Sequence, residues 1–314
     1  MTPSQFVQSA DVKLAVYTWG KPSKNKPTVV LVHGYPDAAN VWKASAELLA
    51  KRYFVVAYDV RGAGLSTRPT QKSAYDLKFL VDDLAAVVDA VSPKKAVHLL
   101  AHDWGSIQSW EAVTTPTLQG RLASYTTISG PSLDHAGHWI RQRLSSGSPK
   151  QLAQLARQAA HSWYIYMFHL PVVAPAIWQF AGDKFWPTVL NKAEGIKDAE
   201  VNPTQNEDGR MGVNLYRANI LNRVLWPQQR HATIPVQLIV PTGDHFMVQE
   251  IWDDLSQWAS KLWRREVDSG HWIPLSHPQL VADYAAEFID FIELCEGILF
   301  WYVFNRIGIA SKKR

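Results

Sequence analysis

The 314-residue chain lacks features that several classes of protein require. Its one cysteine, Cys295, excludes an internal disulfide and any cysteine-rich zinc site and fits a reducing compartment, so we expect a cytoplasmic location. No stretch approaches the roughly 20 apolar residues of a membrane span, and no N-terminal basic region precedes an apolar run, as in a secretory signal. The formal net charge is only +4, without a basic stripe interleaved with aromatic residues, so nucleic acid is not an expected partner.

What the chain does contain is apolar and aromatic residues. Hydrophobic residues make up 47% of the sequence, and 14 residues are Trp. This composition is typical of a folded globular protein. The aromatic residues indicate large apolar cavities or interfaces, and the alternative is that they only fill the core. The length fits one large domain with an insertion, or two modest domains.

Strand and helix patterns alternate over the first part of the chain and again near its end. Residues 5–10 and 13–18 predict a hairpin around Asp11, and further strands are predicted at residues 28–32, 54–58, 96–100, 125–128, 236–240 and 263–267. Apolar residues at helical spacing predict helices near 41–49, 75–91, 252–260 and 279–292. This alternation predicts an α/β fold with a mostly parallel, doubly wound sheet.

The alternation stops between residues 133 and 228, where helical stretches such as 151–160 and 213–225 occur without a clear strand. We therefore expect a helical cap over residues 133–228, inserted between two parts of an α/β core at 1–132 and 229–297. Residues 298–314 form an apolar tail that ends in basic residues. Three interpretations of this tail stay open: a docked terminal helix, an anchor with weak contact to a membrane interface, or a junction where a longer protein was cut.

The strongest candidate for chemistry follows the strand predicted at 96–100. The small residues Ala101 and Gly105 flank Asp103 at the spacing of a nucleophile elbow, a sharp strand-to-helix turn that exposes its central side chain above the sheet. A carboxylate in this position can attack a saturated carbon and form an alkyl ester. The alternative is that Asp103 only caps the following helix.

An acid and a base follow the last two predicted strands. Asp244 comes after strand 236–240, and His271 comes after strand 263–267. The order nucleophile, acid, histidine is the one expected for an α/β-hydrolase. In this arrangement Asp244 orients the imidazole of His271, and His271 deprotonates water.

The loop after strand 28–32 reads His33-Gly34-Tyr35-Pro36. In α/β-hydrolases this loop supplies one backbone donor of the oxyanion hole, and the residue after the nucleophile supplies the other. The two donors would then be the amides of Tyr35 and Trp104. An ordinary Gly/Pro turn is the alternative.

These motifs together resemble the epoxide hydrolase branch of the α/β-hydrolase fold, over residues 5–292. The matching residues are His33-Gly34-Tyr35-Pro36, His102-Asp103-Trp104-Gly105, Asp244 and Gly270-His271-Trp272. The same part of the chain also resembles the N-terminal half of bacterial proteins that fuse an epoxide hydrolase to a short-chain dehydrogenase.

The resemblance implies two cap tyrosines that donate hydrogen bonds to the epoxide oxygen. The segments 163–171 and 214–219 match the family's two cap motifs and give this role to Tyr164 and Tyr216, although His169 stands where the family has Gln. A phenol, with an ordinary pKa near 10, is protonated at neutral pH and can supply the proton that the departing alkoxide needs. The alternative is that both tyrosines only pack within the cap.

The resulting prediction is a cofactor-independent and metal-free epoxide hydrolase that converts a small apolar epoxide to a vicinal diol through an ester on Asp103. Two alternatives stay open. A haloalkane or haloacetate dehalogenase would use the same Asp103, Asp244 and His271, and a non-catalytic binder would capture a small apolar ligand under the cap. The sequence indicates neither a particular epoxide nor an oligomeric state.

Overall fold

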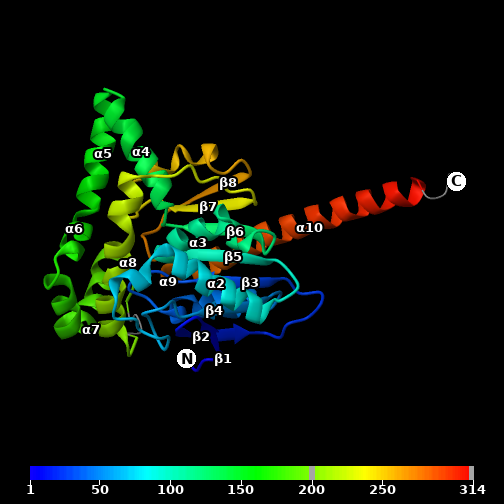
Figure 1. Cartoon of the computed structure of the whole chain (residues 1–314), viewed down its shortest axis with the longest axis horizontal. Coiled ribbons are helices and arrows are strands. Elements are labelled where there is room, and N and C mark those ends of the chain that lie inside the picture. The colour runs from blue at the N-terminus through cyan, green and yellow to red at the C-terminus, as the bar shows by residue number, and fades with distance from the viewer. Residues whose placement is uncertain (198–201, 311–314) are drawn as a thin grey trace.

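The computed structural model describes residues 1–197 and 202–310, with side chains described up to residue 295. Its strands are β1 (Gln5–Ser9), β2 (Val12–Trp19), β3 (Thr28–Val32), β4 (Phe54–Tyr58), β5 (Val97–His102), β6 (Leu122–Ile128), β7 (Val236–Pro241) and β8 (Leu262–Val267). They form one sheet in the order β1-β2-β4-β3-β5-β6-β7-β8 (Figure 1). Strand β2 pairs antiparallel with β1 and β4, and the other neighbours pair parallel. The predicted fold class is therefore confirmed.

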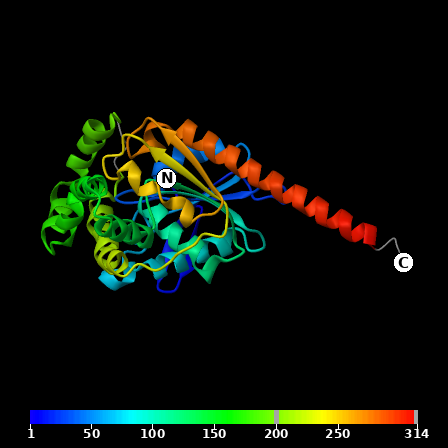
Figure 2. The ribbon, with the colours of Figure 1, turned by 90° about the horizontal axis from the view of Figure 1, so that it is seen from above.

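Helices cover both faces of this sheet. The α-helices of the described residues are α1 (Lys43–Leu49), α2 (Leu77–Val91), α3 (Trp104–Thr114), α4 (Leu133–Ser145), α5 (Pro149–His161), α6 (Trp163–His169), α7 (Val173–Glu194), α8 (Gln205–Leu225), α9 (Ile273–Ser276) and α10 (Pro278–Ala310). Helices α2 and α3 pack together on one face, and α1 packs with α10 on the other (Figure 2). Every residue of β4, β5 and β6 is buried, as expected for parallel strands covered on both sides.

The register of the sheet brings the ends of its central strands to one edge. His102, the last residue of β5, lies opposite Ile128 of β6, and Pro241 of β7 lies opposite Val267 of β8. Ligand sites of open α/β sheets lie outside the carboxyl ends of the strands. The loops that follow β5, β7 and β8 therefore meet at this edge.

Helices α4 to α8 form a separate group at one end of the molecule (Figure 1). Helix α8 packs along α7 and also contacts α4 and α6. Among the described residues, no single helix is long and apolar enough to cross a membrane. Helices α6 and α7 reach that threshold only as a pair, and the pair is bent by 109°. The expected cap also includes residues 198–201, which lie outside the described residues.

Two helix predictions differ from the structure. The helix expected at 252–260 is wrong: the segment forms two short 3₁₀ turns, Gln249–Trp252 and Leu255–Gln257. The buried residues Trp252, Leu255 and Trp258 recur every three positions, which matches the 3₁₀ repeat.

The last helix is longer than the predicted 279–292. Helix α10 continues to Ala310, and no proline after Pro278 interrupts it. The later part of α10 extends away from the sheet (Figures 1 and 2). The basic residues at the end of the tail, within 311–314, lie outside the described residues.

Candidate active site

Asp103 occupies a strained turn between β5 and α3. Its backbone has φ 53° and ψ −124°, a conformation that L-residues rarely adopt and that marks functional turns. The turn is also crowded, because a Cβ atom at Gly105 would lie 2.2 Å from the carbonyl oxygen of Val32. A Cβ at Gly130, which the sequence did not single out, would lie 2.1 Å from the carbonyl oxygen of Asp103. Glycine at both positions lets neighbouring backbone support the turn.

The loop after β3 lies directly against the Asp103 carboxylate. The backbone N–H of Tyr35 donates a hydrogen bond to Oδ1 of Asp103 at 2.7 Å. A Cβ at Gly34 would lie 2.3 Å from the same oxygen. Trp104 is the first residue of α3, and the first N–H groups of a helix have no carbonyl partner within it. The N–H of Tyr35 therefore contacts the carboxylate, and the N–H of Trp104 directly follows Asp103 in the chain.

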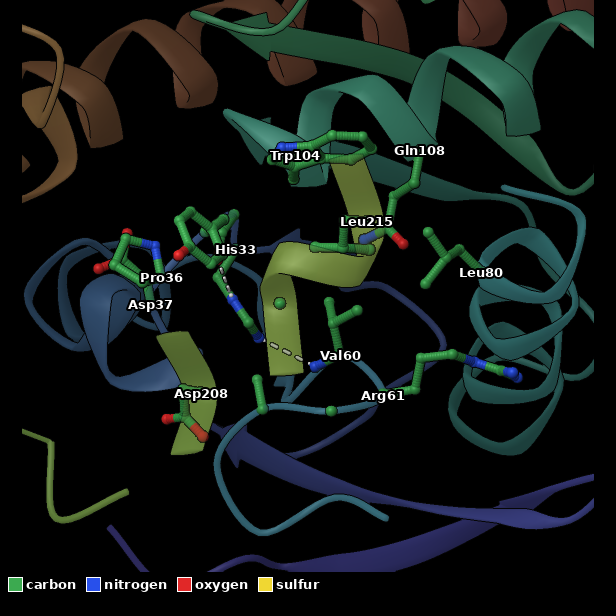
Figure 3. A pocket seen from close by; sticks show the side chains of 15 residues that line it. His33, Pro36, Asp37, Val60, Arg61, Leu80, Trp104, Gln108, Asp208 and Leu215 are labelled. Atoms are coloured by element: carbon green, nitrogen blue, oxygen red, sulfur yellow. Dashed lines mark hydrogen bonds between the residues drawn. The ribbon is translucent and has the colours of Figure 1, made fainter. Parts of the chain in front are cut away.

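His33 fixes the shape of this loop. Its Nε2 accepts the N–H of Val60 at 2.9 Å, so the ring proton is on Nδ1, which donates to the carbonyl oxygen of Gly34 at 2.8 Å. Burial lowers the pKa of His33, which keeps the ring neutral. His33 lines a small cavity of about 20 Å³. Figure 3 shows His33, Trp104 and Asp208 among the side chains around it.

His271 lies between two carboxylates. Its Nδ1 is 3.0 Å from Oδ2 of Asp244, and its Nε2 is 3.6 Å from Oδ2 of Asp103. Burial lowers the pKa of His271, but the negative charges of Asp244 and Asp103 outweigh burial and raise it to about 10. Asp244 is held in turn by the N–H groups of Phe246 and Met247, at 2.8 and 3.1 Å from its Oδ1. The structure thus brings the three predicted residues together, with His271 between Asp103 and Asp244.

Two more side chains hold the loop that carries His271. Nε2 of His102 lies 2.9 Å from the carbonyl oxygen of His271, to which it donates. Burial lowers the pKa of His102 to about 4, so this ring is neutral. Oδ2 of Asp37 accepts the indole N–H of Trp272 at 2.9 Å, and burial raises the pKa of Asp37 to about 7. The sequence predicted no role for Asp37, although it directly follows the His33–Pro36 motif.

A cavity of about 230 Å³ opens above Asp103, between the sheet and helices α6 to α8. Its walls are Tyr35, Pro36, Asp103, Trp163, Tyr164, Met167, Phe168, Ala174, Ile177, Trp178, Phe185, Trp186, Val189, Tyr216, Phe246, His271 and Trp272. Of these described wall residues, only Asp103 and His271 carry a charge. Water is therefore largely replaced by apolar and aromatic surface around the carboxylate.

Tyr164 of α6 and Tyr216 of α8 both line this cavity, as the sequence predicted. Their ring centroids are 5.9 Å apart, with the ring planes at 86°. Burial raises the pKa of both phenols above the ordinary value for tyrosine, and the negative charge of Asp103 raises it further. Both phenols therefore hold their protons at neutral pH and are potential proton donors.

Comparison with known proteins identifies the family of the chain. The profile of the alpha/beta hydrolase fold family matches residues 27–278, so the chain belongs to this family. It is similar to the "Probable oxidoreductase EphD" of Mycobacterium tuberculosis, with 36% identity over 303 residues that cover 94% of this chain and 50% of that protein. It is also similar to "Epoxide hydrolase A" of the same organism, with 34% identity over 174 residues, or 55% of this chain and 49% of that protein. The chain thus spans about half the length of these relatives.

Solved structures with the same fold include epoxide hydrolases. One from Bacillus megaterium, a mutant in complex with its diol product, superposes with a TM-score of 0.75 and 19% identity, covering 91% of this chain and all of that one. The epoxide hydrolase VrEH1 of Vigna radiata gives a TM-score of 0.72 at 22% identity, covering 91% of this chain and 97% of that one. The predicted α/β-hydrolase fold and the predicted likeness to epoxide hydrolases are both confirmed.

Proposed function

We propose that this α/β-hydrolase is an epoxide hydrolase that converts a small, uncharged epoxide and water to a vicinal diol. The observation that carries the proposal is that one apolar cavity holds a carboxylate nucleophile on one wall and two protonated phenols, Tyr164 and Tyr216, on another. A nucleophile and acids that face the same space are what opening of a strained ether requires.

In the first step, Asp103 attacks an epoxide carbon. Its Oδ1 is occupied by the N–H of Tyr35, so Oδ2 is the attacking oxygen. The carbon–oxygen bond of the epoxide breaks as the new ester bond forms, and the departing oxygen takes a proton from Tyr164 or Tyr216. The product of this step is a hydroxyalkyl ester of Asp103.

In the second step, His271 activates water. Ester formation removes the charge of Asp103, which is one of the two charges that raise the pKa of His271. The phenolate then regains a proton and the imidazole loses one. The neutral imidazole of His271 can now act as a base. Water, deprotonated by His271, attacks the carbonyl carbon of the ester, and the amides of Tyr35 and Trp104 stabilise the oxyanion. Collapse of this intermediate releases the diol and restores the carboxylate.

We further propose that residues 133–228 act as the cap of this enzyme. Helices α6, α7 and α8 from this range supply wall residues of the cavity, including both tyrosines, while Asp103 and His271 come from the core. The cap therefore closes the reacting carbon away from bulk water. No cofactor or metal ion takes part in the proposed chemistry.

The test compares the wild-type chain with Asp103→Asn on a panel of terminal, aromatic and fatty-acid epoxides, without added cofactor, and measures diol by chromatography. We expect diol from at least one uncharged epoxide with the wild type and a loss of at least about a thousandfold in Asp103→Asn. Release of chloride from a haloalkane without diol from any epoxide would instead favour the dehalogenase. Ligand binding without turnover would favour the non-catalytic binder.

A further inference from the structure

Glu194, the last residue of α7, points from the cap toward the core. It shares one face of the helix with Trp186 and Leu190, because the three residues are spaced by four, and both apolar residues are buried. Gly195 follows with φ 67° and ends the helix in a left-handed cap. The end of α7 therefore fixes the Glu194 carboxylate between helices α6 to α8 and the core.

This carboxylate contacts the residues on both sides of His271. Oε2 of Glu194 accepts the backbone N–H of Trp272 at 3.0 Å. A Cβ at Gly270 would lie 2.1 Å from the same oxygen, so the loop backbone packs directly against it. The ring of Trp186 also packs edge-on against the ring of Trp272, with centroids 5.0 Å apart. Helix α7 thus holds the loop of His271 from the cap side.

The position of Glu194 opposes ordinary helix electrostatics. A negative side chain in the last turn of a helix is repelled by the helix dipole. Burial raises the pKa of Glu194, and its Oε1 is buried without a hydrogen-bond partner among the described residues. The N–H of Trp272 and the positive charge of His271 offset part of the cost of burial. Local rules are usually broken in this way where a residue serves the site.

We propose that Glu194 is a positioning residue for the hydrolytic step. It holds the loop so that Nε2 of His271 faces the ester on Asp103, while His102 holds the carbonyl of His271 from the core side. This inference rests on the proposed function. Attack on the epoxide uses Asp103 and the two cap tyrosines, so loss of Glu194 slows ester hydrolysis and leaves ester formation unchanged.

The kinetic test compares Glu194→Ala and Glu194→Gln with Asp183→Asn, which alters an exposed carboxylate on the same helix. Formation and decay of the ester are followed by rapid quenching and intact-mass measurement. In Glu194→Ala we expect ester decay to slow about tenfold, the rate change that loss of one charge-assisted hydrogen bond gives. The values of kcat and KM then fall together, so that kcat/KM is unchanged.

Glu194→Gln keeps an oxygen that can accept the N–H of Trp272, so we expect it to restore most of the hydrolytic rate. Asp183→Asn should match the wild type. The inference is overturned if kcat/KM falls in Glu194→Ala, if ester decay is unchanged, or if Glu194→Gln is as slow as Glu194→Ala.

A second measurement does not depend on epoxide turnover. Hydrogen exchange followed by mass spectrometry should show faster exchange in the peptide that contains Trp272 in Glu194→Ala, but not in Asp183→Asn. Unchanged exchange would show that Glu194 does not hold the loop. Absence of diol formation by the wild type would contradict the proposed function, while this exchange experiment would still decide the structural part of the inference.

Discussion

Nε2 of His271 lies 3.6 Å from Oδ2 of Asp103, and the opposite nitrogen of the same ring lies 3.0 Å from Oδ2 of Asp244. One imidazole therefore separates the part-buried carboxylate of Asp103 from the buried carboxylate of Asp244, and a positive ring is stabilised from both sides. In the proposed mechanism, ester formation on Asp103 removes one of the two charges, and the reaction itself then changes the protonation state of the proposed base.

The first prediction concerns stability and pH. His271 has a pKa of about 10 in the folded protein, above the ordinary value of about 6.5 that it recovers on unfolding. A group whose pKa is raised by folding stabilises the fold fully below its unfolded pKa and loses that contribution as pH rises through its folded pKa. The stabilisation by His271 is therefore complete below about pH 6.5 and disappears toward about pH 10.

This effect is measured by chemical denaturation of the wild type and of His271→Gln at several pH values across that window. At low pH we expect the wild type to have a free energy of unfolding that exceeds that of His271→Gln by on the order of a few kcal/mol, and we expect this difference to disappear as pH rises. A difference between the two proteins that is constant from about pH 6 to about pH 10 would contradict a charged His271 in the resting protein.

The second prediction is that His271→Gln traps the ester. Asp103 and the cap tyrosines are intact in this variant, so the first step proceeds, but no base activates water. After incubation with an epoxide, the intact mass should increase by the mass of that epoxide, and peptide mapping should place the addition on Asp103. His271→Gln combined with Asp103→Asn is the matched control and should gain no mass. An unmodified His271→Gln that still binds the epoxide would contradict the assignment.

The third prediction concerns the two phenols. General acid catalysis by a positioned side chain contributes roughly 100- to 10,000-fold. We expect Tyr164→Phe and Tyr216→Phe each to reduce kcat/KM by about tenfold or more, because the remaining phenol still donates, and the double variant to reduce it much further. Tyr166→Phe is the control, since Tyr166 lies on the same helix as Tyr164 and is 67% exposed. Equal rates in the wild type and in all four variants would show that the phenols only pack.

Much of the core could be predicted from the sequence because its signals are local. Strands β3, β5 and β7 are short, largely apolar runs that are almost entirely buried, and residues with predicted roles follow shortly after them. The small residues Ala101 and Gly105 predicted the turn at Asp103. The role of Gly130 was not predicted, because this residue lies in the loop after β6 and meets Asp103 only in the folded chain.

The cap was harder to predict. Helix α7 packs against α8 on one side and lines the cavity with Ile177, Phe185 and Val189 on another, so apolar residues surround it and helical periodicity is weak. The role inferred for Glu194 depends on a contact with Trp272, 78 positions away. No spacing rule within one helix can show such a contact, although a carboxylate on the buried face of α7 is a local sign that something pairs with it.

The most direct test of the central claim is a single turnover in ¹⁸O-labelled water with enzyme in excess over epoxide. If Asp103 forms a covalent ester, the oxygen added to the first diol comes from the Asp103 carboxylate. The diol is then unlabelled, and the label appears in the peptide that contains Asp103. A first diol that carries ¹⁸O, with no label in that peptide, would mean that water attacks the epoxide directly and would contradict the covalent mechanism.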